Sequence, residues 1–91
     1  MRHHILVKWK EGYRADVAKI RQLFEETLEI PGISCVSVHP NVVDRANRYD
    51  LLILIHMERQ ALETYDACEA HHRWKDEYGQ FIEKKAIFDC E

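Results

Sequence analysis

The 91-residue chain has few of the features that mark a specialised class of protein. It contains three cysteines, at positions 35, 68 and 90, an odd and widely spaced set without a CxxC pair. That pattern argues against a disulfide framework and favours reduced thiols that pack as small apolar side chains. The three glycines are isolated from one another, so the chain has no glycine-rich loop to hold a phosphate group.

Charge of one sign and long apolar runs are also missing. Thirteen basic and sixteen acidic residues give a net charge of -3, and no run of Lys or Arg exceeds two residues, which argues against a nucleic-acid partner. The longest apolar run, Leu51 to Ile55, is far too short to cross a bilayer. The first residues lack the apolar region of a signal peptide. We therefore expect a cytoplasmic protein with neither a nucleic-acid nor a membrane partner.

Hydrophobic periodicity predicts four strands and two helical segments. Alternation with a period of two indicates strands, and apolar residues at three- and four-residue steps indicate an amphipathic helix. The Pro31-Gly32 pair ends the first helix, and Gly79 is a weak point near the end of the second helical segment. The expected elements are a strand over 3–9, a helix over 14–28, strands over 33–38 and 49–57, a helical segment from 58, and a strand over 85–90.

The order β-α-β-β-α-β predicts one α+β domain over residues 1–91 with a ferredoxin-like fold. In this fold both helices pack on one face of a four-stranded antiparallel sheet. The strand over 49–57 is apolar on both faces, so the second face of the sheet needs a cover of its own. Two copies that pack these open faces together would supply it, and we therefore expect a homodimer.

Several motifs spread over the chain resemble those of the stress-responsive α/β-barrel, or Dabb, domains. They are the opening His3-His4-Ile5-Leu6-Val7-Lys8-Trp9-Lys10-Glu11-Gly12, the central Tyr49-Asp50-Leu51 and Ala61-Leu62-Glu63-x-Tyr65 followed by His71, and the closing Phe88-Asp89. The resemblance covers essentially the whole chain and implies a dimeric α/β barrel. The chain departs from the family signature at Cys68-Glu69, where family members have His-Pro.

One plant branch of that family acts as a polyketide cyclase, and this implies roles for three residues. Tyr65 and His71 match the acid/base pair of an intramolecular aldol cyclisation, and His3 matches a residue that lines the same cavity. A neutral imidazole can remove the proton between two carbonyl groups, and a phenol can hydrogen-bond the developing oxyanion. The further candidate binding residues are Leu23, Cys68, His72 and Trp74.

This chemistry requires no organic cofactor and no metal. Cys68 with His71 or His72 offers two metal ligands, too few for a tetrahedral site. On an unbroken helix, His72 at i+7 shares a face with Tyr65, whereas His71 at i+6 is turned away. A break near Glu69 is needed to bring His71 back. Without it, Tyr65 and His71 are explained as parts of the apolar stripe of a core helix.

The sequence thus favours a stress-responsive homodimer that binds a small organic molecule, hydrophobic or polyketide-like, in a cavity between sheet and helices. One alternative is a cofactor-independent cyclase or isomerase that uses Tyr65 and His71. Two others are a structural stress protein whose cavity is filled by its own side chains and a small cofactor-free monooxygenase of the same topology.

Overall fold

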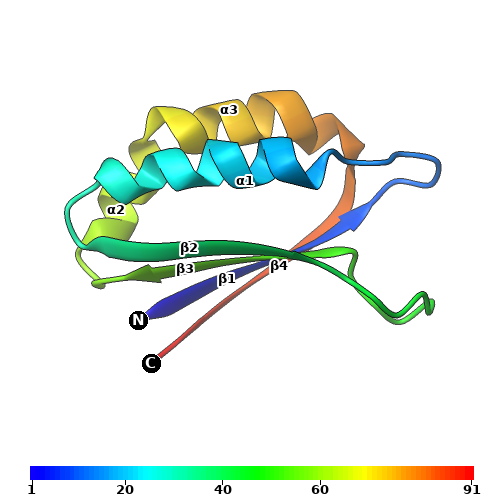
Figure 1. Ribbon diagram of the computed structural model, residues 1–91, viewed down its shortest axis with the longest axis horizontal. Helices are drawn as coiled ribbons and strands as arrows, with labels where there is room; N and C mark the ends of the chain where they lie inside the picture. The colour runs from blue at the N-terminus through cyan, green and yellow to red at the C-terminus, as the bar shows by residue number, and fades with distance from the viewer.

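The computed structural model describes all residues from Met1 to Glu91. One antiparallel sheet with strand order β2-β3-β1-β4 carries all the helices on one of its faces (Figure 1). The predicted α+β ferredoxin-like fold is confirmed. Its elements are β1 (Arg2–Trp9), α1 (Val17–Glu25), η1 (Glu26–Glu29), β2 (Ile33–Pro40), β3 (Leu51–Met57), α2 (Ala61–Ala67), α3 (Glu69–Tyr78), η2 (Gly79–Phe81) and β4 (Ile82–Cys90).

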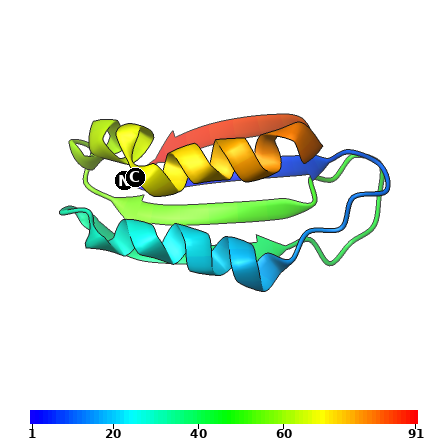
Figure 2. The same ribbon diagram turned by 90° about the horizontal axis from the view of Figure 1, so that it is seen from above.

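The central strands β1 and β3 build the core from every second residue, because successive side chains of a strand point to opposite faces. The register sets Ile5 opposite both Ile53 on β3 and Ile87 on β4. Ile5 and Ile53 lie under the helices at 2% and 0% exposure. Ile87, on the edge strand, remains 48% exposed on the same face. The helical layer therefore covers the middle of the sheet and leaves its β4 edge open (Figure 2).

The opposite face of the sheet is apolar at its centre, and no helix covers it (Figure 1). His4 there stands between Leu54 on β3 and Phe88 on β4, and Phe88 is 63% exposed. Leu6 and Leu52 form the next cross-strand pair. We call the patch made by Leu6, Leu52, Leu54, Ala86 and Phe88 the open face.

Helix α1 begins three residues later than the sequence predicts. Asp16 ends the preceding loop in an extended conformation, and its side chain accepts a hydrogen bond from the Lys19 N–H at 3.3 Å. This capping bond satisfies one of the free N–H groups at a helix start, so the helix begins at Val17 rather than at Arg14. The helix then tightens into the 3₁₀ turn η1 after Glu25.

Gly32 fixes how β2 enters the sheet. Its φ of +95° lies in the left-handed region, and a Cβ built there would come within 3.2 Å of the Ala61 Cβ. Its carbonyl accepts a hydrogen bond from the Glu58 N–H at 2.8 Å. Only glycine fits both constraints, and the turn therefore holds the start of β2 against the start of α2.

Three predicted starts in the second half of the chain are wrong. β3 begins at Leu51 rather than at Tyr49, and the helical segment begins at Ala61 rather than at Glu58. That segment is divided at Cys68, which supplies the break near Glu69 that the pairing of Tyr65 with His71 requires. The last strand begins at Ile82 rather than at Lys85, because β4 pairs with β1 as far as Trp9.

None of the helices has the length and apolar character needed to span a bilayer.

Candidate functional site

Cys68 separates α2 from α3 and creates the break on which the predicted site depends. Its backbone is extended, with φ −73° and ψ 159°, and its N–H donates to the Tyr65 carbonyl at 3.1 Å. Its Sγ accepts a hydrogen bond from the His71 N–H at 3.4 Å. The chain thus changes direction between Tyr65 and His71, and their ring centroids lie 4.8 Å apart.

Tyr65 stands at the centre of the candidate site. Its side chain is buried, at 1% exposure, and its hydroxyl is buried without a hydrogen-bond partner. Burial, with smaller contributions from Cys68 and Asp66, raises the pKa of the Tyr65 phenol well above its ordinary value. The hydroxyl is therefore neutral at physiological pH and keeps its proton available for donation.

His71 packs against Tyr65 in a defined tautomer. Its Nδ1 lies 2.9 Å from the Asp66 carbonyl oxygen, and since a carbonyl only accepts, Nδ1–H is the donor and the neutral ring keeps its lone pair on Nε2. Burial lowers the pKa of His71 below its ordinary value, and the nearby Lys75 and Lys85 act in the same direction. The hydrogen bond to the Asp66 carbonyl opposes this shift. The imidazole is therefore held in its neutral, proton-accepting form.

His3 completes a cluster of three rings. It is 5% exposed, and its ring meets Tyr65 edge-on with centroids 5.4 Å apart. Its Nδ1 lies 2.5 Å from Asp89 Oδ1 on β4. A carboxylate that binds one ring nitrogen fixes the orientation of the imidazole. We call His3, Tyr65 and His71 the ring cluster.

The ring cluster combines one hydroxyl donor with two oriented imidazoles. A carbonyl or hydroxyl oxygen placed against Tyr65 would accept its unused hydrogen bond, and the lone pair on His71 Nε2 could accept a proton from an adjacent carbon or oxygen. Such a set can bind a polar oxygen atom and can move one proton. No group of three or more His, Cys, Asp or Glu side chains is arranged to hold a metal ion.

The other residues predicted for the site lie outside the ring cluster. Leu23 and Trp74 belong to the hydrophobic core, at 6% and 1% exposure. The ring of Trp74 packs against Phe24, with centroids 5.1 Å apart. His72, which an unbroken helix would turn toward Tyr65, is exposed instead. Cys68 accepts a hydrogen bond from the His71 N–H and makes none with the Tyr65 hydroxyl.

No surface cavity is lined by a member of the ring cluster. Two small clefts reach its neighbours instead. A cleft of about 300 Å³ includes Leu62 and Asp89, and a second of about 390 Å³ includes Cys68 and Glu69. The ring cluster is therefore closed to the surface. One cleft reaches Asp89, the partner of His3, and the other reaches Cys68, which accepts the His71 N–H.

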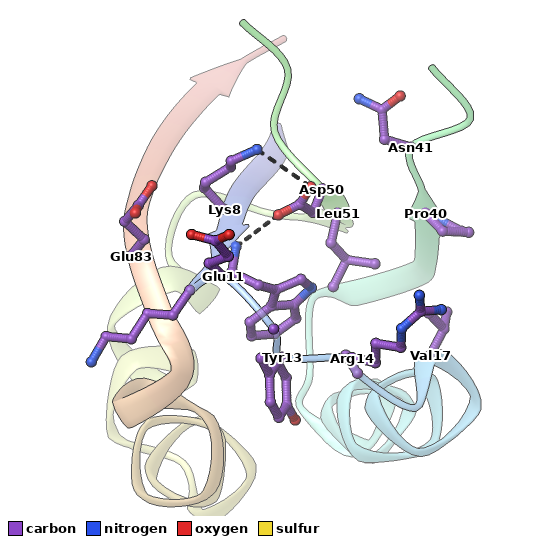
Figure 3. Close-up of a pocket in the computed structure, with 14 residues that line it drawn as sticks. Lys8, Glu11, Tyr13, Arg14, Val17, Pro40, Asn41, Asp50, Leu51 and Glu83 are labelled. Carbon is purple, nitrogen blue, oxygen red and sulfur yellow. Dashed lines mark hydrogen bonds and ion pairs between the residues drawn. The ribbon is translucent and has the colours of Figure 1, made fainter. Parts of the chain in front are cut away.

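The largest cavity lies at the other end of the molecule, where the loops after β1 and β2 meet (Figure 3). It measures about 820 Å³, and Trp9, Tyr13 and Arg14 contribute to its lining. Asp50 binds across it, because its carboxylate accepts the Trp9 N–H at 2.8 Å and pairs with Lys8 Nζ at 3.7 Å (Figure 3). We call this the loop-end cavity.

Sequence reasoning missed two residues that shape the ring cluster. Asp89 was part of the family-like ending, but its place opposite His3 follows only from the β1–β4 register. Asp66 acts through its backbone carbonyl, and a side-chain pattern carries no signal for that. The tautomers of both imidazoles therefore depend on contacts that only the folded chain reveals.

No family model matches the sequence, and no curated protein matches it, but solved structures share its fold. A Dabb family protein with a ferredoxin-like fold from Mesorhizobium loti has a TM-score of 0.66 at 14% identity, over 99% of this chain and 93% of the other. A dimeric ferredoxin-like protein of unknown function from Thermobifida fusca has a TM-score of 0.78 at 14% identity, over 96% and 85%.

A third solved structure with this fold is an enzyme. The hydroxynitrile lyase of Passiflora edulis has a TM-score of 0.73 at 13% identity, over 96% of this chain and 87% of the other. These identities show a common fold and leave activity to be argued from the site. The resemblance to Dabb domains predicted from the sequence is confirmed at the level of the fold.

Proposed function

We propose that the protein binds a small organic molecule whose carbonyl or hydroxyl oxygen accepts the hydrogen bond of Tyr65. The observation that carries this proposal is the buried Tyr65 hydroxyl without a partner. Leaving such a group unpaired costs a fold about 1–3 kcal/mol, and each unpaired buried group in a native protein calls for an explanation, such as a catalytic role or a bound water or ion. An oxygen atom from a ligand would recover that free energy.

The surroundings of Tyr65 define the kind of molecule. The rings of His3 and His71 flank it at centroid distances of 5.4 and 4.8 Å, and the core side chains around it are apolar. Because the ring cluster is closed, the ligand is small, and side chains at one of the adjoining clefts move to admit it. A compact ketone with an apolar group matches these requirements.

Small ketones can test the binding proposal directly. We would titrate phenylacetone, acetophenone and acetylacetone into the labelled protein and follow backbone amide shifts by NMR. At least one ketone should give saturable shifts at residues 65–71 and at His3, and Tyr65→Phe should abolish them. Tyr78→Phe is the matched control, since it removes a hydroxyl from α3 outside the ring cluster and should leave binding intact.

The proposal is wrong if no ketone gives saturable shifts at these residues, or if Tyr65→Phe binds as well as the wild type. The first outcome would favour a structural protein whose interior is filled by its own side chains. Shifts confined to Trp9, Tyr13 and Asp50 would place the binding site in the loop-end cavity instead.

A second candidate function is cofactor-independent acid/base catalysis on such a molecule. His71 supports it, because its free Nε2 and lowered pKa suit a general base near neutral pH. Tyr65 would stabilise the enolate oxygen as a neutral donor. The fold accommodates an enzyme, since the hydroxynitrile lyase of Passiflora edulis shares it.

Proton abstraction can be measured without knowing the natural substrate. The protein should accelerate exchange of the benzylic protons of phenylacetone in D₂O, followed by proton NMR. His71→Gln should lower the rate by about 10²-fold or more, as expected for loss of a general base. The exposed neighbour His72→Gln should not. Equal rates for both variants would rule out His71 as the base.

We further propose that the protein works as a homodimer joined through the open face. Exposed apolar area of this kind needs a partner, and a two-fold axis brings a patch onto its own copy. The protein from Thermobifida fusca with this fold is described as dimeric.

We further propose that the protein is cytoplasmic, since all three cysteines are unpaired and a reducing compartment keeps thiols in that state.

Two neighbouring residues on β4 can identify the interface. Phe88 lies on the open face and Ile87 on the helix side of the same edge strand. Sedimentation velocity should give twice the 10.9 kDa chain mass for the wild type and a monomer for Phe88→Glu. Ile87→Glu should remain dimeric. A wild-type monomer at micromolar concentration, or dissociation by Ile87→Glu alone, would contradict the open-face dimer.

A further inference from the structure

Cys68 is the one residue that belongs to neither α2 nor α3, and its backbone and side chain serve both helices. Its N–H closes α2 on the Tyr65 carbonyl at 3.1 Å, and its own carbonyl accepts the His72 N–H at 3.2 Å. Its Sγ accepts the His71 N–H at 3.4 Å, which makes it the N-cap of α3. A single residue thus ends one helix and begins the next.

The local sequence contains no glycine or proline that would break the helix here. Ala67, Glu69 and Ala70 are good helix formers, and no glycine or proline lies between Ala61 and Tyr78. In a continuous helix, His71 would be turned about 240° from Tyr65, so the two rings could not meet. The 4.8 Å separation of their centroids therefore depends on the extended conformation of Cys68.

We propose that Cys68 is the positioning residue of the ring cluster: by capping α3 with its thiol it holds the break that turns His71 toward Tyr65. The inference rests on the proposed function, in which the pair formed by Tyr65 and His71 binds the ligand. Cys68 makes no hydrogen bond to the Tyr65 hydroxyl and needs no contact with a ligand in this role. It acts through the direction of the first turn of α3.

The chemistry of the cap predicts which substitutions keep the break. Sulfur is a weak acceptor, and cysteine is not among the preferred N-cap residues, whereas serine is. Cys68→Ser should therefore keep or strengthen the break. Cys68→Ala removes the acceptor and adds a strong helix former, so it favours fusion of α2 and α3 into one helix.

A proline at position 69 should replace the thiol by an independent route. Glu69 is the first residue of α3, where proline is favoured because the missing N–H is not needed. The residue before a proline is restricted to extended conformations, and Cys68 already has ψ 159°. Glu69→Pro loses the acidic residue in the first turn of α3 and the pair of the exposed Glu69 carboxylate with Arg73 at 3.8 Å, which are minor contributions to stability.

The test compares Cys68→Ala with the rescue variant Cys68→Ala/Glu69→Pro. NMR would measure the pKa of the His71 ring and the nuclear Overhauser effects between the His71 and Tyr65 rings. In Cys68→Ala these effects should disappear and the pKa of His71 should return toward its ordinary value. The double variant should restore the ring contacts and the lowered pKa of His71. Cys68→Ser should retain them, and Cys35→Ala should leave them unchanged.

Unchanged ring contacts in Cys68→Ala, or failure of the double variant to restore them, would overturn the proposal. If Cys68→Ala alone does not fold, the proposal still requires a folded double variant with intact ring contacts. None of these readouts uses a ligand. A wild type that binds no ketone would therefore defeat the proposed function while the ring contacts still decide the role of Cys68.

Discussion

The two ends of the molecule differ in whether their polar groups have partners. At the loop end, in the cavity of about 820 Å³, the Asp50 carboxylate accepts a hydrogen bond from the Trp9 N–H and pairs with Lys8. Tyr65 lies at the other end with no cavity and no partner. The proposed site therefore rests on the unmet hydrogen-bonding capacity of Tyr65 and on the two rings beside it, rather than on the volume of a cavity.

Among these substitutions, Trp74→Ala should have the largest effect on the free energy of unfolding. It tests whether the core between the two ends of the molecule is packed or contains an empty cavity. The Trp74 ring contacts Trp9 toward the loop end and Phe24 on α1, with centroids 6.2 and 5.1 Å away. If it is a core residue rather than the lining of a ligand cavity, Trp74→Ala should lower the free energy of unfolding by about 3–5 kcal/mol.

Urea unfolding measures this change, with exposed His72→Ala as the control, expected within about 0.5 kcal/mol of the wild type. A loss below about 1 kcal/mol for Trp74→Ala would mean that the side chain borders empty space. That result would weaken the distinction between a closed site and an open cavity.

Asp50→Ala should lower the stability of the protein through the loop end. The substitution leaves the Trp9 N–H without its acceptor and Lys8 without its ion pair. Loss of a buried acceptor costs about 1–3 kcal/mol, and we expect the lower end of this range because the Asp50 side chain is 38% exposed. Asp44→Ala, in the same loop and without a partner, should be neutral. Equal stability of the two variants in thermal unfolding would show that the loop-end bonds are not needed.

Alkaline titration should separate Tyr65 from the other tyrosines. Its folded pKa is raised, so above the ordinary value of about 10 the unfolded chain releases a proton that the fold retains, and stability falls as pH rises. The tyrosinate absorbance of the native protein should therefore be the same in the wild type and in Tyr65→Phe until alkaline unfolding. A smaller amplitude in Tyr65→Phe near pH 10 would show a solvated phenol.

His71 should give the smallest effect, at mildly acid pH. The pKa of His71 is lowered in the folded protein. Below the ordinary value of about 6.5, the unfolded chain therefore binds a proton more readily than the folded chain, and stability decreases as the pH is lowered. The wild type should lose more stability between pH 7 and pH 5 than His71→Gln does, as followed by urea unfolding. His72→Gln, on an exposed side chain, should behave like the wild type.

The fold could be predicted from the sequence because its causes are local and repeated. Alternation along 3–9 and 49–57 and the turn at Pro31-Gly32 specify the elements and their order. The break at Cys68 could be stated only as a condition, since neither cysteine nor glutamate is a recognised helix breaker. The place of His3 beside Tyr65 could be predicted from the family resemblance, but its hydrogen bond to Asp89 could not, because that contact depends on the register of two strands that are 86 residues apart at that point.

The measurement that tests the account most directly is the free energy of unfolding of Tyr65→Phe. If the Tyr65 hydroxyl is buried without a partner, its removal should leave stability unchanged or raise it by about 1 kcal/mol, while ketone binding is lost. A fall of about 1–3 kcal/mol would show that the hydroxyl already has its partner within the fold. The ring cluster would then be part of the core, and no ligand would be needed to complete it.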